Sequence, residues 1–219
     1  MTDPDGWLPR DTCLGIRMKK DGKEKPRESR APLTEDNLRG LTIGELRPLQ
    51  SPVRVVEYDS EWPLRFESFA SEIRSALSNR ALRVDHVGST SVPGLPSKPI
   101  LDILLVVVDS ANEANYVPHL ESRGYKLHIR EPEWYEHRML KGPEDAVNLH
   151  VFPHGCEEID QMVCFRDWLR TNRGDLELYA RTKLTLAQRE WKYTQNYADA
   201  KTEVIEEILA KMKAARTTA

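Results

Sequence analysis

The chain has 219 residues, of which 39% are hydrophobic and 31% are charged, and this composition predicts one globular core rather than two full domains. Its formal net charge of −3 excludes the large basic field that bulk nucleic-acid binding requires. No apolar run reaches the roughly 18 residues of a membrane span, and the N-terminal segment lacks the apolar stretch of a signal peptide. We therefore expect a cytoplasmic protein without a membrane partner.

The three cysteines predict reduced thiols. Cys13, Cys156 and Cys164 are an odd number, and their spacing is not that of a redox pair. No Cys or His stands at zinc-binding spacing from them, so we expect no zinc site.

Residues 1–52 differ in composition from the remainder. They contain six of the fourteen prolines and the mixed-charge run KKDGKEKPRESR, which has no apolar periodicity and predicts a solvated linker. Residues 33–49 contain spaced leucines behind Thr34, which can cap a helix, and predict a short helix or a stretch docked on the main body. We expect a partly flexible N-terminal extension without a catalytic role.

From residue 53 the pattern becomes regular. Residues 53–59 (VRVVEYD) are rich in β-forming residues and predict a short strand, after which Asp59 or Ser60 can cap a helix. Apolar residues recur in that helix at steps of three and four: Trp62, Phe66, Phe69, Ile73 and Leu77. Residues 81–87 predict a strand, and the near-continuous apolar run of residues 100–108 (ILDILLVVV) predicts a central one.

The second half predicts one helix, three strands and then helices only. Residues 111–124 predict a helix that ends at Gly124. Residues 125–130, 134–141 and 146–152 predict three strands in a meander. The chain from residue 157 has two helical apolar stripes. The expected fold is therefore α+β (mixed α/β), a mixed sheet flanked by helices with a helical C-terminal third, in one domain over residues 53–215.

A small-residue turn and a strand carboxylate are the main functional signals. Gly88 is followed by Ser89, Thr90 and Ser91, whose backbone N–H groups and hydroxyls can form a nest for an anion. Thirteen residues after Ser89, Asp102 interrupts an apolar strand, where a charge must be paired or bound to a metal. An ordinary loop, and an aspartate paired with an arginine or a backbone amide, remain the plain alternatives.

Several segments resemble the GrpB family, whose fold belongs to the nucleotidyltransferase superfamily. The matching segments are Glu57-Tyr58 with Trp62, residues 86–95 (HVGSTSVPGL), 98–103 (KPILDI), 149–151 (LHV) and 165–170 (FRDWLR), and the pairs Tyr179 with Lys183 and Tyr197 with Lys201. They extend over roughly 155 residues, and the long central motif is highly specific. The resemblance implies a nucleotidyltransferase-like fold and an anion pocket more than a particular reaction.

The resemblance also implies roles for individual residues. The phosphates of a nucleotide would be cradled by Gly88, Ser89, Thr90 and Ser91, and bound by the cations Lys98, Arg166, Arg170, Lys183 and Lys201. Asp102 would hold Mg²⁺ with His150 as a second metal ligand, and His86 and His150 would act with Asp102 in catalysis. For the cations, the alternative is a solvated helix surface on which acids such as Asp167 pair with them.

One departure from the superfamily weakens the metal prediction. Active nucleotidyltransferases carry a second acid two residues after the first, where both carboxylates face the same side and share the metals, but residue 104 is Leu. His150 is the best candidate for the third acidic position, with Glu136 as an outside candidate.

Three functions are consistent with this pattern. The first is an enzyme that binds a nucleoside triphosphate, ATP with Mg²⁺, and activates or modifies a small anionic metabolite. The second is a catalytically inactive module that binds a nucleotide or another small anion. The third is an ATP-dependent enzyme that forms an amide or ester on an amino-acid-like substrate. The nucleotide, the acceptor and the oligomeric state are left open by the sequence.

Overall fold

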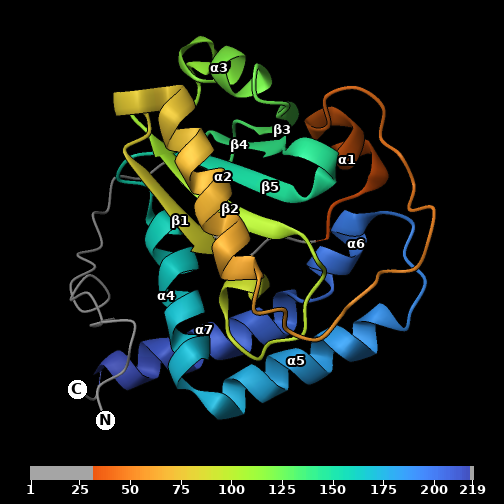
Figure 1. Ribbon diagram of the computed structural model, residues 1–219. Helices are drawn as coiled ribbons and strands as arrows, with labels where there is room; N and C mark the ends of the chain where they lie inside the picture. The colour runs from red at the N-terminus through yellow and green to blue at the C-terminus, as the bar shows by residue number, and fades with distance from the viewer. Residues whose placement is uncertain (1–31, 218–219) are drawn as a thin grey trace.

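The computed structural model describes residues 32–217, so Cys13 and the mixed-charge run lie outside the described part. Its centre is a five-stranded sheet with the order β1-β2-β5-β4-β3 (Figure 1). The strands are β1 (Arg83–Val87), β2 (Leu101–Val107), β3 (Lys126–Glu131), β4 (His137–Lys141) and β5 (Val147–Pro153). The β2–β5 pair is parallel and the other three pairs are antiparallel. The expected α+β class and the meander of the last three strands are therefore confirmed.

One face of the sheet is covered by α2 (Trp62–Leu77) and α3 (Val117–Glu121) (Figure 1). Side chains alternate between the two faces of a strand, and every second residue of β2 packs beneath α2: Leu101, Ile103, Leu105 and Val107. The apolar stripe of α2 meets them through residues such as Phe66 and Ile73. This cluster is the main core of the protein.

The C-terminal helices lie on the side of the other face. They are α4 (Glu157–Thr171), α5 (Arg173–Ala187), α6 (Thr194–Asp199) and α7 (Thr202–Thr217). Leu104 and Val106, the intervening residues of β2, pack with Ile159 and Val163 of α4. Within residues 32–217, no helix combines the length and the apolar character needed to cross a membrane.

Two expected elements differ from the structure. Residues 53–59 form no strand, because Val53 packs with Leu186 and Tyr197 and only Val56 forms a bridge, with Ser97. The helix expected over residues 111–124 is reduced to a 3₁₀ turn, Glu113–Asn115, and the short α3. Pro118 lacks the N–H that a helix interior requires, so it is tolerated only in the first turn of α3.

The cap of α2 is also displaced from the expected position. Glu61, rather than Asp59 or Ser60, is the N-cap residue. The carboxylate of Asp59 instead accepts a hydrogen bond from the Glu61 backbone N–H at 2.9 Å. Asp59 therefore stabilises the turn that precedes the helix.

Residues 32–52, here called the arm, dock on the main body. They begin with α1 (Glu35–Leu41), which is capped by the Thr34 hydroxyl as expected. Beyond α1, the Ile43 N–H donates to the His128 carbonyl of β3 at 2.8 Å, and the Leu49 N–H donates to the Lys192 carbonyl before α6 at 2.9 Å. Figure 1 shows α1 lying beside β3 and above α6. The arm thus spans the space between the sheet and the C-terminal helices.

Candidate functional site

The face of the sheet opposite α2 presents polar side chains from four neighbouring strands. Asp102 of β2 lies opposite Asn148 of β5, and His150 of β5 lies two residues further along the same face. On β3 and β4, Glu131 lies opposite His137. A cavity of about 670 Å³ opens over these residues and is also lined by α4, α5, α6 and α7 and by the arm. The strand register therefore gathers residues that are up to 48 positions apart in the chain, Asp102 and His150.

The small-residue turn sits directly on Asp102. Gly88 has φ 67° and ψ −171°, a backbone conformation that is essentially restricted to glycine. A Cβ at Gly88 would lie only 2.7 Å from the Asp102 Cβ and 2.9 Å from its Cγ. The turn continues as a single 3₁₀ turn, Ser89–Ser91, rather than a helix. Gly88, Ser89 and Thr90 all line the cavity.

Asp102 is ionised and is held in place by two neighbours. Asn148 Nδ2 donates to its Oδ1 at 2.8 Å, and His150 Nε2 lies 3.6 Å from the same oxygen. Burial raises the pKa of Asp102, but the contacts with His150 and Asn148 and the positive charge of Lys98 outweigh it and bring that pKa well below its ordinary value. The site therefore contains a permanent negative charge next to the turn.

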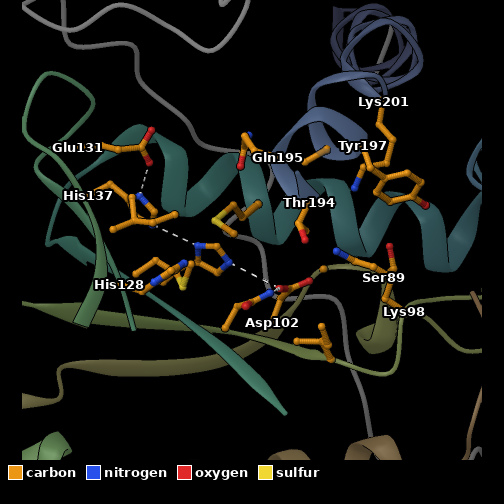
Figure 2. Close-up of a pocket in the computed structure, with 18 of the residues that line it drawn as sticks. Ser89, Lys98, Asp102, His128, Glu131, His137, Thr194, Gln195, Tyr197 and Lys201 are labelled. Atoms are coloured by element: carbon orange, nitrogen blue, oxygen red, sulfur yellow. Dashed lines mark hydrogen bonds and ion pairs between the residues drawn. The ribbon is translucent and has the colours of Figure 1, made fainter. Parts of the chain in front are cut away.

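Two lysines flank one tyrosine at the same end of the cavity. Lys98 Nζ lies 5.5 Å, and Lys201 Nζ 5.1 Å, from the centroid of the Tyr197 ring. Burial, with the charges of Lys201 and Lys141, lowers the pKa of Lys98 to about 8, although Asp102 opposes this. Positive charge is therefore concentrated near the turn. Figure 2 shows Lys98 beside Ser89 of the turn, and Lys201 beside Tyr197.

The other expected cations bind the backbone of the turn region. Arg166 Nη1 donates to the His86 carbonyl at 2.9 Å, and Arg170 donates twice to the Ser91 carbonyl, at 3.0 and 2.7 Å. The fully buried Lys183 donates to the Pro96 carbonyl at 2.6 Å. These contacts fix both ends of the segment that carries the turn. Direct phosphate binding by these three residues stays a prediction, and Arg170, unlike Arg166 and Lys183, does not line the cavity.

His86 and Ser91 support the turn from behind. His86 lies opposite Ile103 on β1, so its ring points to the α2 face, where it stacks on Phe66 at 4.8 Å. Its Nε2 is 3.0 Å from the Thr90 hydroxyl. The Ser91 hydroxyl donates to the Gly88 carbonyl at 2.5 Å. Neither His86 nor Ser91 lines the cavity. Strand alternation turns the His86 side chain away from the cavity. Contact of His86 or Ser91 with a ligand stays a prediction.

We expect His86 to make the protein less stable in acid. Burial lowers its pKa to about 4, whereas a histidine in the unfolded chain titrates near 6.5. Between these values only the unfolded chain takes up the proton, so stability is complete above about pH 6.5 and falls by about 2–3 kcal/mol by about pH 4.5. Urea unfolding at both ends of this range should show that loss reduced in His86→Phe. The same substitution at the exposed His119 is the control, and an unchanged loss in His86→Phe would contradict the assignment.

Several cavity residues were not predicted from the sequence. Glu131 and His137 form a hydrogen-bonded pair at 2.7 Å, and Lys141 Nζ donates to Asn148 Oδ1 at 2.7 Å. His137 is not evident from the sequence, because a lone histidine in a strand carries no signal by itself. Its position on the same face as His150 depends on the pairing of β4 with β5. Side chains alternate between the two faces of a strand, so residues 137 and 141 share a face, and this was the available clue.

The donors on this face do not fit a resident pair of magnesium ions. Within residues 32–217, no group of three or more His, Cys, Asp or Glu side chains is arranged to hold a metal ion. Leu104, at the position of the second acid, is fully buried. The Glu136 carboxylate accepts hydrogen bonds from Arg138 and does not line the cavity. Asp102 is therefore the one carboxylate on β2, and it lies beside His150.

Comparison with known proteins places the chain in a defined group. A family model described as GrpB protein matches residues 52–211. A UPF0157 protein of Halalkalibacterium halodurans is 54% identical over 190 residues, which cover 87% of this chain and 97% of that protein. The crystal structure of the conserved protein GrpB from Enterococcus faecalis has a TM-score of 0.59 at 28% identity, over 71% of this chain and 99% of that chain. A structure of Cid1 with a UTP analogue aligns at a TM-score of 0.38 and 9% identity over 59% of this chain and 42% of that one, too distant to inform activity.

Proposed function

Because this chain belongs to the GrpB family, whose model matches residues 52–211, we propose that it binds the phosphates of a nucleoside triphosphate beside Asp102 and transfers a nucleotidyl group to a small anionic acceptor. The observation that carries this proposal is the seating of the Gly88 turn on the Asp102 side chain, at the floor of the cavity. A backbone that passes this close to a carboxylate without a side chain leaves room for a ligand to reach both groups.

The charges around the turn favour an anionic ligand. Lys98, Lys141 and Lys183 all have lowered pKa values, because burial disfavours their charge. Lys201 further lowers the pKa of Lys98 and of Lys183. A bound phosphate would relieve this repulsion and supply partners for the ammonium groups. The nest at Ser89 and Thr90 adds neutral donors at the same end of the cavity.

The proposed reaction uses Asp102 and His150 on the acceptor. A hydroxyl or carboxylate oxygen of the acceptor bonds to the α-phosphorus, the bond from that phosphorus to its bridging oxygen breaks, and pyrophosphate leaves. Where the acceptor is a hydroxyl, its proton passes to His150 Nε2, which faces the cavity beside Asp102. The negative charge of Asp102 then stabilises the protonated ring. No step is assigned to a metal.

A second function is favoured by the burial of Leu104. With no second carboxylate on β2, the cavity would act as a receptor for a nucleotide or another small anion without turning it over. Both functions predict the same binding. Only the first predicts pyrophosphate release when small acceptors, including amino-acid-like ones, are added. Mass spectrometry of such mixtures separates the two functions.

We expect Lys98→Met to weaken nucleoside triphosphate binding by about tenfold or more, because a charge-assisted hydrogen bond contributes roughly 1.5–3 kcal/mol. In the unsubstituted protein the affinity should also fall as the pH rises through about 8, where Lys98 loses its proton. Calorimetric titration with several nucleotides, with and without Mg²⁺, measures both effects. Lys213→Met, at an exposed position of α7 outside the cavity, is the matched control. Equal affinities of the two variants would contradict the phosphate site.

A further inference from the structure

We propose that Glu131 and His137 are positioning residues, which hold His150 in the tautomer with its proton on Nδ1 and leave Nε2 unprotonated toward Asp102 and the cavity. The tautomer itself does not depend on the proposed function. Its use to accept a proton from a substrate rests on that function.

A continuous line of side chains crosses four strands. Glu131 of β3 contacts His137 of β4, with 2.7 Å between Oε2 and Nδ1. His137 contacts His150 of β5, with 3.1 Å between Nε2 and Nδ1. His150 Nε2 then lies 3.6 Å from Asp102 Oδ1 of β2. Figure 2 shows these three contacts as a single dashed path from Glu131 to Asp102.

The direction of the hydrogen bonds follows from the end of the line. An ionised carboxylate only accepts, so His137 must carry its proton on Nδ1 to donate to Glu131. The Nε2 of a neutral His137 then has a lone pair, and it accepts the proton on Nδ1 of His150. A neutral His150 consequently has no proton on Nε2. Asp102 is an ionised carboxylate as well, but its Oδ1 lies 3.6 Å from His150 Nε2, beyond hydrogen-bond distance, whereas the other two contacts measure 2.7 and 3.1 Å. With one proton on each neutral ring, the two shorter contacts therefore contain the protons.

Packing keeps the middle of the line rigid. The His137 side chain is 4% exposed. Its ring stacks on Phe152 with centroids 4.6 Å apart, and meets the edge of Trp134 at 5.0 Å. The ring therefore has little freedom to turn over and exchange its two nitrogens. His150 is 23% exposed, so it is the more accessible of the two rings that border the cavity.

The substitution Glu131→Gln should reverse the direction of the hydrogen bonds along the line. Unlike the carboxylate, a glutamine amide can donate to His137 Nδ1. His137 would then donate from Nε2 to His150 Nδ1, and His150 would donate from Nε2 to Asp102. All three contacts would contain a proton with both rings neutral, so we expect this arrangement to be preferred. The substitution changes one atom of a buried side chain and leaves the packing in place.

The test is the imidazole ¹⁵N spectrum of the full chain, recorded at about pH 8, above the ordinary histidine pKa. We expect His150 to carry its proton on Nδ1 in the unsubstituted protein and on Nε2 in Glu131→Gln. Glu133→Gln, the same change at an exposed residue of the β3–β4 connection, should match the unsubstituted protein. His150 protonated on Nε2 without substitution, or an unchanged tautomer in Glu131→Gln, would overturn the proposal.

A second variant covers the case in which Glu131→Gln does not fold. His137→Phe keeps a ring between Phe152 and Trp134 but removes both hydrogen bonds, so His150 should become a mixture of tautomers. A His150 that stays wholly protonated on Nδ1 in this variant would again overturn the proposal. In a nucleotidyl-transfer assay, Glu131→Gln should lower kcat by roughly 10²-fold with little change in KM. A tautomer switch in a protein without turnover would refute the proposed reaction and leave the positioning role standing.

Discussion

Asp102→Asn is expected to abolish turnover of the bound nucleotide, with a loss of roughly 10²–10³-fold or more. Asparagine removes the charge that stabilises a protonated His150 and that raises the pKa of Lys98. The measurement is pyrophosphate release from the nucleotide that binds most tightly, in the presence of small acceptors.

The fold should survive this substitution, because the asparagine carbonyl can still accept the hydrogen bond from Asn148. Asp109→Asn is the control, since this exposed carboxylate accepts a hydrogen bond from the Ala111 backbone that an asparagine oxygen can also accept. Thermal unfolding of both variants should stay close to that of the unsubstituted protein. Undiminished turnover in Asp102→Asn would remove this carboxylate from the reaction.

Gly88→Ala is expected to destabilise the protein and to destroy the binding site together. The alanine Cβ would overlap the Asp102 side chain, and the backbone conformation of Gly88 is one that alanine avoids. Strain and displacement together should reduce the free energy of unfolding by on the order of 3 kcal/mol, which lowers the Tm by roughly 6–12 °C for a domain of this size. Nucleotide affinity should fall in parallel, because the turn and Asp102 can no longer occupy their present positions.

Gly94→Ala separates backbone strain from crowding. Gly94 also has a positive φ, of 77°, but nothing lies within 4 Å of a Cβ at that position. Its substitution should therefore cost only about 1–2 kcal/mol, the strain of the left-handed conformation alone. Equal losses of stability in the two variants would show that the close approach to Asp102 has no effect of its own.

The parts of the site that follow from local sequence were predicted, and the parts that follow from pairing were not. The Gly88 turn and Asp102 stand next to, or within, strands that the apolar pattern identifies. The cation roles of Arg166 and Arg170 depend on which carbonyls face their helix, and helical spacing cannot reveal this. His137 and Glu131 enter the site only through the pairing of β3, β4 and β5.

The elements of the fold also divide into those that local sequence reveals and those that tertiary packing decides. Residues 100–108 and the α2 stripe are long and strongly periodic, so their element types were evident. Residues 53–59 have the composition of a strand, but Val53 packs against residues of α5 and α6 and not against a strand of the sheet. Local preference is a weak guide where tertiary packing offers an alternative.

The arm supplies a wall of the cavity from outside the region that the family model matches. Residues 52–211, which match the family model, contain the turn, Asp102 and His150. Leu38, Leu41 and Leu46 also border the cavity, and they precede the matched region. A substitution in the arm can therefore alter the roof of the cavity without altering the floor that carries Asp102 and His150. Two relatives with the same floor and different roofs would keep one chemistry and admit ligands of different size and shape.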